Sequence, residues 1–247
     1  MNDILARFPK QRPPLPPAIA AIYARQYASN RQGGTAAASL AQRVESWLHR
    51  QVAADVAGGG GADAPTLELG AGTLNQLPWE PSVSTYDIVE PLAFLYEGSP
   101  HLPRVRHVFA DIAQVPAHHR YRRITSVATL EHVCDLPRLV ARCGLLLGDG
   151  GVFRASVPSE GTWLWTLGWK LTTGLEFRLR HGLDYGELMR HEHVNTADEI
   201  EAVLRHCFGA LRCRVFGLSR AHSLYRYYEC TGPLAERCTA LAGAGPA

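Results

Sequence analysis

The stretch TLELGAGTLNQLPWEP, residues 66–81, decides how this sequence is interpreted. Alternating apolar residues at its start predict a strand, and Gly70 and Gly72 follow immediately. Glycine lets the backbone turn tightly and lets a ligand approach without a Cβ in the way. An acidic residue, Glu68, lies just before the first glycine. The segment therefore predicts a strand that ends in a ligand-binding turn with a carboxylate beside it.

Beyond this stretch, predicted strands and helices alternate. Six further strand-type runs occur at residues 84–91, 105–112, 124–130, 151–158, 211–218 and 223–230. One helix is expected after Asp135 as its N-cap, and another after Thr196, which can form a capping box with Glu199. Strand–helix alternation of this kind predicts an α/β protein with a parallel sheet covered on both faces. The last two runs predict a closing pair of strands.

The flanking segments suggest three parts in the chain. Helices are predicted at 18–27 and, from the spacing of apolar residues, at 39–56, before the breaking run GGGGADAP. A segment rich in Trp, Leu, Gly and Arg interrupts the alternation and does not match one regular element. The expected parts are an N-terminal helical extension at 1–60, the α/β domain at 61–232 with a lid insertion at about 159–195, and a C-terminal tail at 233–247. The last residues, 241–247, are expected to fray.

Composition favours a small-molecule partner. Hydrophobic residues make up 46% of the chain and charged residues 19%, with a formal net charge of +2. This near-neutral balance lacks the basic excess that nucleic-acid binding requires, so no nucleic-acid partner is expected. No signal-peptide pattern or bilayer-length apolar run is present, and the six cysteines form no CxxC pair. The sequence therefore predicts a cytoplasmic protein with reduced thiols and no transmembrane segment.

The glycine turn discriminates between two ligand classes. A dinucleotide-binding turn has the pattern G-x-G-x-x-G, whereas the third glycine position here is Asn75. A carboxylate at Glu68 would repel a pyrophosphate but would suit a ligand with an α-amino group or a sulfonium. S-adenosylmethionine has both groups and no phosphate. The turn therefore favours S-adenosylmethionine over a dinucleotide.

Two more acids end the next two predicted strands. Glu90 lies 20 residues beyond Gly70, where an acid can accept both hydroxyls of a ribose, a feature that dinucleotide sites share. Asp111 ends the third strand and could hold the adenine amino group. Each acid alone could equally be a helix cap or a solvated loop residue. Acids at three consecutive strand ends are a more specific pattern than any one of them.

The run from Thr66 to Ser159 resembles class I S-adenosylmethionine-dependent methyltransferases, of the small-molecule type 11/12 kind. The matching pieces are LELGAG, YDIVEP, ADI, ATLEHVCDLPRLVARCGLLLGDGGVFRASVPS and, beyond them, HEHVNTADEIEAVL. The fourth piece is the most specific, because a strand, L-E-H, a helix, a G-G turn and a strand ending in V-P occur together in that family. The resemblance implies a Rossmann-like seven-stranded sheet, mostly parallel with an antiparallel last strand and helices on both faces.

Carried over by position, the resemblance also implies a set of cofactor-binding residues. They are Glu68, Gly70, Ala71, Gly72, Asn75, Glu90, Pro91, Asp111, Ile112, Thr129, Leu130 and Glu131. Two positions depart from the family's common pattern: Ala71 stands where a cysteine is frequent and Leu74 where a third glycine is frequent. Neither change removes a charge that the cofactor needs, although Leu74 could reshape the loop.

Methyl transfer to a hydroxyl requires an aligned acceptor and a group that takes its proton. The candidates for this base are His132, just after the fourth strand, and His191 and His193 in RHEHVN. The alternative for His132 is that it only braces its loop. The pair His191 and His193 could suggest metal ligands, but the sequence shows no third ligand nearby, so no metal is expected.

The insertion is expected to contact the acceptor. Candidate substrate-binding residues are Trp163, Trp165, Arg178 and Tyr185. The tryptophans could equally pack as a minor core or touch a membrane or a second subunit of a homo-oligomer, and core packing is the simplest interpretation of any one of them. Arginine could grip a carboxylate or phosphate on the acceptor, although solvated arginines are commoner.

The sequence leaves three functions open. The first is methyl transfer from S-adenosylmethionine to a small molecule such as a sugar or another secondary metabolite. The second is a nicotinamide-dependent oxidoreductase, which Glu68 and Asn75 disfavour. The third is a methyltransferase fold that serves as a binding subunit without chemistry, which the intact set of acids disfavours.

Overall fold

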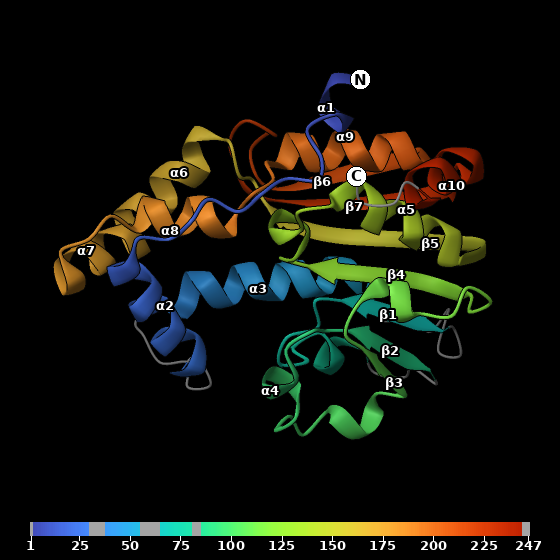
Figure 1. Cartoon of the computed structure of the whole chain (residues 1–247), viewed down its shortest axis with the longest axis horizontal. Helices are drawn as coiled ribbons and strands as arrows, with labels where there is room; N and C mark the ends of the chain where they lie inside the picture. Colours follow the sequence, from blue (N-terminus) through green and yellow to red (C-terminus); the bar gives the residue numbers. More distant parts are fainter. Residues whose placement is uncertain (1, 30–37, 55–64, 81–84, 244–247) are drawn as a thin grey trace.

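A seven-stranded sheet forms the centre of the molecule (Figure 1). The computed structural model describes residues 2–29, 38–54, 65–80 and 85–243. The strand order is β3-β2-β1-β4-β5-β7-β6, with β1 Thr66–Leu69, β2 Tyr86–Val89, β3 His107–Phe109, β4 Tyr121–Val127, β5 Leu147–Pro158, β6 Phe208–Gly217 and β7 Ser223–Pro233. Strands β1 to β5 pair in parallel, whereas β7 is antiparallel to both of its neighbours. The predicted sheet, mostly parallel with an antiparallel last strand, is confirmed.

The helices begin largely where the sequence predicts them. They are α1 Asn2–Leu5, α2 Pro17–Ser29, α3 Ala38–Val52, α4 Ala93–Tyr96, α5 Leu136–Leu146, α6 Trp163–Trp169, α7 Leu175–His181, α8 Tyr185–Glu192, α9 Ala197–Cys207 and α10 Ala235–Gly243. The side chain of Asp135 accepts a hydrogen bond from the backbone of Arg138 at the start of α5. The capping box of Thr196 and Glu199 is present at the start of α9. Both predicted caps are therefore confirmed.

Helices cover both faces of the sheet. On β5, Phe153, Ala155 and Val157 are buried in the main hydrophobic core, which also contains the apolar faces of α5 and α9. Successive side chains of a strand point to opposite faces, so Arg154 and Ser156 point the other way. These two donate hydrogen bonds to backbone carbonyls of α3. Helix α3 therefore covers the face opposite to α5 and α9.

The lid segment, residues 159–195, is helical. It contains α6, a π-helical turn at Lys170–Gly174, α7 and α8. Helix α2 packs on this segment instead of on the sheet, and the two share a small buried cluster of Ile19, Ile22, Phe177 and Leu188. Figure 1 shows α2 and the lid helices gathered at one end of the molecule. The irregular composition of the lid thus reflects short helices around a core of their own.

Residues 241–243 are helical, whereas the sequence predicts that they fray. Helix α10 packs on α5 and buries Cys238, and it includes Leu241–Gly243 of the segment predicted as a frayed tail. The last four residues lie outside the described part, as does the predicted boundary near residue 60. All six cysteines fall within the described ranges and are free thiols. Within those ranges, no helix is both long and apolar enough to cross a bilayer.

Candidate functional site

The two glycines after β1 both adopt a left-handed backbone, but they differ in surroundings. Their φ angles are +63° at Gly70 and +51° at Gly72. A Cβ built on Gly70 would lie 2.3 Å from Oγ1 of Thr129, whereas a Cβ on Gly72 would meet nothing within 4 Å. Gly70 therefore satisfies close packing against the end of β4. Gly72 leaves open space over the backbone, where a ligand can approach.

Glu90 joins this turn to the end of β2. One carboxylate oxygen accepts a hydrogen bond from the backbone N–H of Gly72 at 2.9 Å, and the other accepts from Leu92 at 3.0 Å. The side chain is buried. A carboxylate has about four lone-pair sites, so two remain for further donors. Glu90, the predicted ribose acid, thus fixes the turn. Its carboxylate can still accept two further hydrogen bonds.

Leu74 stands where the family's common pattern has a glycine, and it has the left-handed backbone geometry that glycine adopts easily. Its φ is +67°, a region that non-glycine residues rarely adopt, and its side chain is fully buried. It lies in a cluster with Ala71, Leu77, Tyr86 and Ile88. Burial of the leucine side chain offsets the strain of this conformation. The loop therefore continues into the underlying core.

Glu68 points into the protein under the turn. It is buried on β1 and accepts a hydrogen bond from the Tyr86 hydroxyl at 2.8 Å. Burial, partly offset by this bond, raises the pKa of Glu68 to about 8. At neutral pH the group therefore carries a proton, and a cation bound at the turn would lower its pKa. From the sequence, Glu68 was expected to be ionised. Its burial, which reverses this expectation, is not visible in the sequence.

The remaining residues expected from the second and third strands lie at different depths. Asp111 is exposed, and its carboxylate accepts a hydrogen bond from the backbone of Ala113 at 2.7 Å. Ile112 is buried and Pro91 exposed. Asn75 is exposed beside α3 and accepts a bond from Thr73. Asp111 thus acts as the cap that the alternative interpretation described, while it also stands at the expected strand end.

The end of β4 supplies the next predicted residues in a short 3-10 turn, Leu130–His132. Leu130 and Glu131 are both buried, and Leu130 belongs to the main core. Asn195, which the sequence analysis did not single out, is fully buried and donates to the carbonyls of Leu130 and Val133 at 2.9 and 2.7 Å. The backbone of Asn195 also donates to the carbonyl of Glu131. This asparagine fixes the turn against the end of the lid.

Two of the three candidate histidines meet in this region. The rings of His132 and His193 lie 5.0 Å apart. Nδ1 of His132 lies 2.9 Å from the backbone carbonyl of Glu192, and Nδ1 of His193 lies 2.9 Å from a carboxylate oxygen of Glu160. His191 instead binds the carbonyl of Pro13 at 2.7 Å. The structure therefore separates His191 from the pair.

Glu160 was missed by sequence reasoning, although it follows the carboxyl end of β5 as the other acids follow their strands. Burial raises the pKa of Glu160, but hydrogen bonds from His193 and Trp165 outweigh it and hold the pKa below its usual value. The Trp165 indole donates to the same carboxylate oxygen at 2.6 Å, and its ring stacks on His193. Trp165 therefore packs against the histidine pair through the ring of His193.

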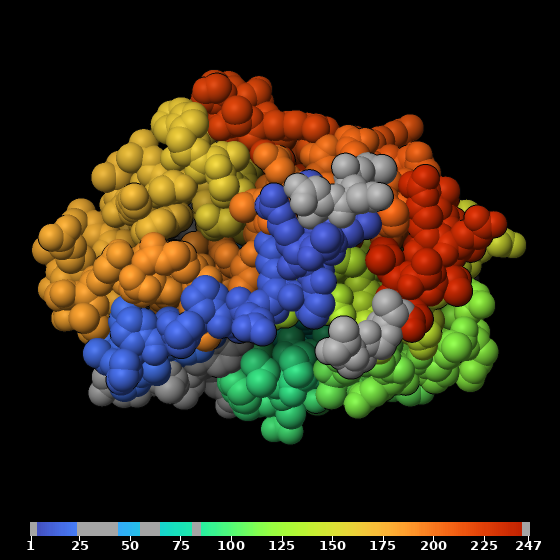
Figure 2. All heavy atoms as spheres, turned by 45° about the horizontal axis from the view of Figure 1, so that its top comes forward, coloured from blue at the N-terminus to red at the C-terminus, as the bar shows by residue number. Residues whose placement is uncertain are grey.

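The N-terminal segment crosses the outside of this site (Figure 2). Lys10 donates to the carbonyl of Val194 and pairs with Glu199 at 2.7 Å. Arg12 donates to the carbonyls of His132 and His191 at 2.6 and 2.9 Å. Residues far apart in the sequence are therefore held together at the point where β4, α8 and α9 meet.

Solved structures share this architecture. Magnesium protoporphyrin IX methyltransferase (ChlM) from Synechocystis PCC 6803 with bound SAH matches with a TM-score of 0.55 and 13% identity, over 87% of this chain and 93% of that one. An O-methyltransferase family protein from Burkholderia thailandensis matches with a TM-score of 0.50 and 14% identity, over 78% of this chain and 56% of that one. The citrinin polyketide synthase CMeT domain matches with a TM-score of 0.50 and 16% identity, over 70% and 46%.

The chain has the class I methyltransferase fold. It spans about half the length of the last two structures. No family model and no curated protein matches the sequence. At these identities the likeness shows the fold alone, and it confirms the fold that the sequence resemblance implied.

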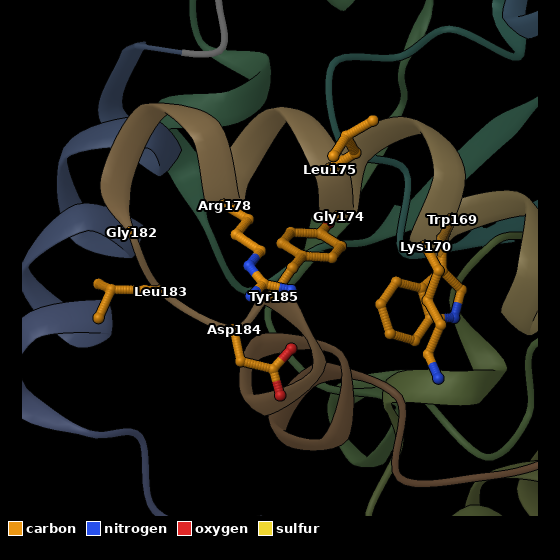
Figure 3. A pocket seen from close by; sticks show the side chains of 9 residues that line it. All are labelled: Trp169, Lys170, Gly174, Leu175, Arg178, Gly182, Leu183, Asp184 and Tyr185. Carbon is orange, nitrogen blue, oxygen red and sulfur yellow. The ribbon is translucent and has the colours of Figure 1, made fainter.

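Among the residues that the structure describes, those of the lid line two cavities. The larger, about 610 Å³, is lined by residues that include Trp169, Arg178 and Tyr185, and Figure 3 shows these side chains around it. The smaller, about 340 Å³, is lined by residues that include Glu160 and His193. Trp163 is exposed against His222 and lines neither cavity. Of the candidate substrate residues, Arg178 and Tyr185 therefore line a cavity and Trp165 borders the histidine pair.

Proposed function

We propose that this protein transfers a methyl group from S-adenosylmethionine to a small-molecule acceptor. The observation that carries the proposal is the clamp between Glu90 and the N–H of Gly72, at the carboxyl edge of a methyltransferase sheet. Ligands of open α/β sheets bind beyond the carboxyl ends of the strands. The cofactor site would consist of the turn at 70–72, Glu90 and the strand-end residues Asp111 and Thr129.

The described residues fit such a cofactor. Open space over Gly72 leaves room for a ligand against the backbone, and Glu90 retains lone pairs for two ribose hydroxyls. The carboxylate of Asp111 accepts one backbone bond and is otherwise exposed, so it can also accept from an adenine amino group. Bound S-adenosylmethionine would supply a methyl group already activated by a sulfonium.

The chain's own task is to align the acceptor and take its proton. In a neutral imidazole one nitrogen donates and the other accepts. The oxygen acceptors at Nδ1 of His132 and His193 assign the proton to Nδ1 in both rings, which leaves both Nε2 lone pairs unprotonated. We propose that one of these Nε2 atoms accepts the acceptor's proton as the new bond to the methyl carbon forms and the carbon–sulfur bond breaks. Trp165, Arg178 and Tyr185 would position the acceptor.

A small acceptor is favoured by the cavities and by the charge. The cavity next to His193 measures about 340 Å³, which suits a metabolite. A polyanion would need many phosphate contacts, and the net charge of +2 does not supply them. Aromatic side chains of the lid suit sugar rings and flat metabolites alike.

The test begins with binding. Isothermal titration should show that the full chain binds S-adenosylmethionine and not NAD. The variant Glu90→Ala should weaken this binding by about ten- to a hundredfold, because charge-assisted hydrogen bonds contribute about 1.5–3 kcal/mol. Glu97→Ala, which removes an exposed acid nearby, is the matched control and should bind as the unmodified chain does.

Turnover then separates an enzyme from a binding subunit. A metabolite screen scored by release of S-adenosylhomocysteine should find an acceptor among small molecules. Binding of NAD instead of S-adenosylmethionine would favour the oxidoreductase. Label from the cofactor that enters mainly RNA, DNA or protein would contradict the acceptor class.

A further inference from the structure

Three metal-ligand side chains converge at the end of β4. Within the described residues, one ligand atom each from Glu131, His132 and His193 lies within 4.8 Å of the others. The carboxylate of Glu131 is 3.7 Å from Nε2 of His132. In the sequence, His191 and His193 show no third ligand nearby, so no metal was expected there. In the structure His193 lies beside His132 instead of His191, and Glu131 is the third possible ligand.

We propose that Glu131, His132 and His193 bind a divalent first-row transition-metal ion. Two imidazoles and one carboxylate form a ligand set that catalytic zinc sites and non-haem iron sites use, with at least one position left open. Metal–nitrogen bonds measure about 2.0–2.1 Å, so two ligand atoms on one ion lie at most about 4 Å apart. The ligand atoms now lie within 4.8 Å of one another, so binding would draw them closer by less than about 1 Å.

The buried carboxylate of Glu131 is the strongest independent sign of a missing ligand. Glu131 is 1% exposed. One of its oxygens, Oε2, is buried and receives no hydrogen bond from any residue that the structure describes. A buried polar atom without a partner is costly, and structures rarely contain one without a reason. A cation bound to the carboxylate of Glu131 would give it the partner that it lacks.

The hydrogen bonds of the histidines prepare the same site. Metal-binding histidines usually donate their other N–H to a carboxylate or a backbone carbonyl, which fixes the ring and its tautomer. Here Nδ1 of His193 faces the carboxylate of Glu160, and Nδ1 of His132 faces the carbonyl of Glu192. Both Nε2 lone pairs are therefore available to an ion. These partners form an outer shell of the kind that metal sites contain.

The local charge also favours a cation. The carboxylates of Glu131, Glu160 and Glu192 surround the two histidines, and Arg12 is the cation that pairs with Glu192 at 3.7 Å. With neutral imidazoles, three acids oppose one arginine. A divalent ion would balance this excess of two negative charges.

The consequence for catalysis rests on the proposed function. An acceptor hydroxyl at the open position of the ion would lose its proton more readily, because a bound cation stabilises the alkoxide. With the ion bound, the two Nε2 atoms would hold the metal instead of accepting the acceptor's proton, and that proton would leave to solvent. The cavity lined by His193 and Glu160 gives an acceptor access to that position.

The test uses the full chain and the metal alone. After removal of metals by a chelator, Zn²⁺ titration should show one equivalent bound, and Co²⁺ should give the visible absorption of a site with nitrogen ligands. Glu131→Gln and His193→Ala should each weaken Zn²⁺ binding at least tenfold. Glu160→Ala should weaken it about 10- to 100-fold through the outer shell. His191→Ala is the matched control and should bind Zn²⁺ as the unmodified chain does.

S-adenosylmethionine binding in the presence of chelator serves as the second readout for every variant. Retained cofactor binding shows that a variant is folded, so its loss of Zn²⁺ is specific. No Zn²⁺ or Co²⁺ bound to the unmodified chain, or equal Zn²⁺ affinity in Glu131→Gln, His193→Ala and His191→Ala, would overturn the metal site while leaving the proposed function intact. Metal binding without cofactor binding would overturn the proposed function instead.

Discussion

The carboxyl edge of the sheet and the lid segment differ in how their side chains are held. At the edge, Glu68, Glu90 and Glu131 are all buried. Glu90 accepts hydrogen bonds from the backbone of Gly72 and Leu92, and Glu68 accepts one from the Tyr86 hydroxyl. In the lid, Leu171 and Leu179 are 63% and 80% exposed. Groups that bind a charged ligand need fixed positions, which a sheet supplies. The comparison teaches that the proposed cofactor site depends on the sheet, whereas exposed apolar side chains gather in the lid.

The largest effect is expected from the two glycines of the turn, which separate stability from binding at the edge. Gly70→Ala should cost about 3–5 kcal/mol, because the new methyl group meets Thr129 and the backbone is left-handed. Gly72→Ala should cost only about 1–2 kcal/mol, since it adds backbone strain without a clash. Its methyl group would instead project into the proposed cofactor space and weaken binding of S-adenosylmethionine.

Denaturant unfolding and cofactor titration of both variants check this prediction. Equal losses of stability in the two variants would mean that Thr129 can move aside, and the edge would then be less rigid than described. Unchanged cofactor binding in Gly72→Ala would place the cofactor elsewhere.

A second, smaller effect is expected from the protonation of Glu68. Its pKa is raised to about 8 by burial, with Glu80 and Glu90 adding to the rise, while Tyr86 and Arg123 oppose it. The folded state therefore binds a proton that the unfolded chain releases above its ordinary pKa. This contribution is fully present at low pH and is lost as the pH rises through about 8. Between pH 6 and pH 8 the loss is about 2 kcal/mol.

Glu68→Gln removes this titration and keeps an acceptor for the Tyr86 hydroxyl. The variant should match the unmodified chain near pH 5 and exceed its stability at pH 8, as measured by urea unfolding at each pH. Parallel stability curves for the two proteins would show that Glu68 titrates normally. In that case Glu68 would be charged at neutral pH, and the edge of the sheet would hold a buried negative charge instead of a neutral acid.

The sheet and the identity of the strand-end acids could be predicted because they depend on local pattern. Apolar alternation locates β1 and β2, and Glu90 follows directly from where the second run ends. The caps at Asp135 and Thr196 depend on residues only three or four positions apart. Such features need no knowledge of the tertiary fold.

The convergence around His193 could not be predicted, because it depends on contacts between distant segments. His193 and Glu160 are 33 positions apart, and Asn195 reaches Leu130 over 65 positions. No periodicity or spacing in the sequence specifies these pairs. The helices of the lid could not be predicted from local pattern either, because they depend on a cluster shared with α2. Charge state was missed for the same reason, because burial of Glu68 is a property of the folded chain.

The smallest effect is expected in the lid, on its exposed apolar side chains. Trp163, Leu167, Leu171, Leu175 and Leu179 occur at every fourth position and are all exposed. Leu179→Gln should change the free energy of unfolding by less than about 0.5 kcal/mol, because a largely exposed side chain has little contact to lose. Phe177→Ala is the matched comparison two residues away: this side chain is 5% exposed in the cluster with α2, and its loss should cost about 3–5 kcal/mol. Urea unfolding of both variants measures the difference. A cost above about 1 kcal/mol for Leu179→Gln would show that this side chain is covered in solution, and the contrast between a fixed edge and an open lid would fail there.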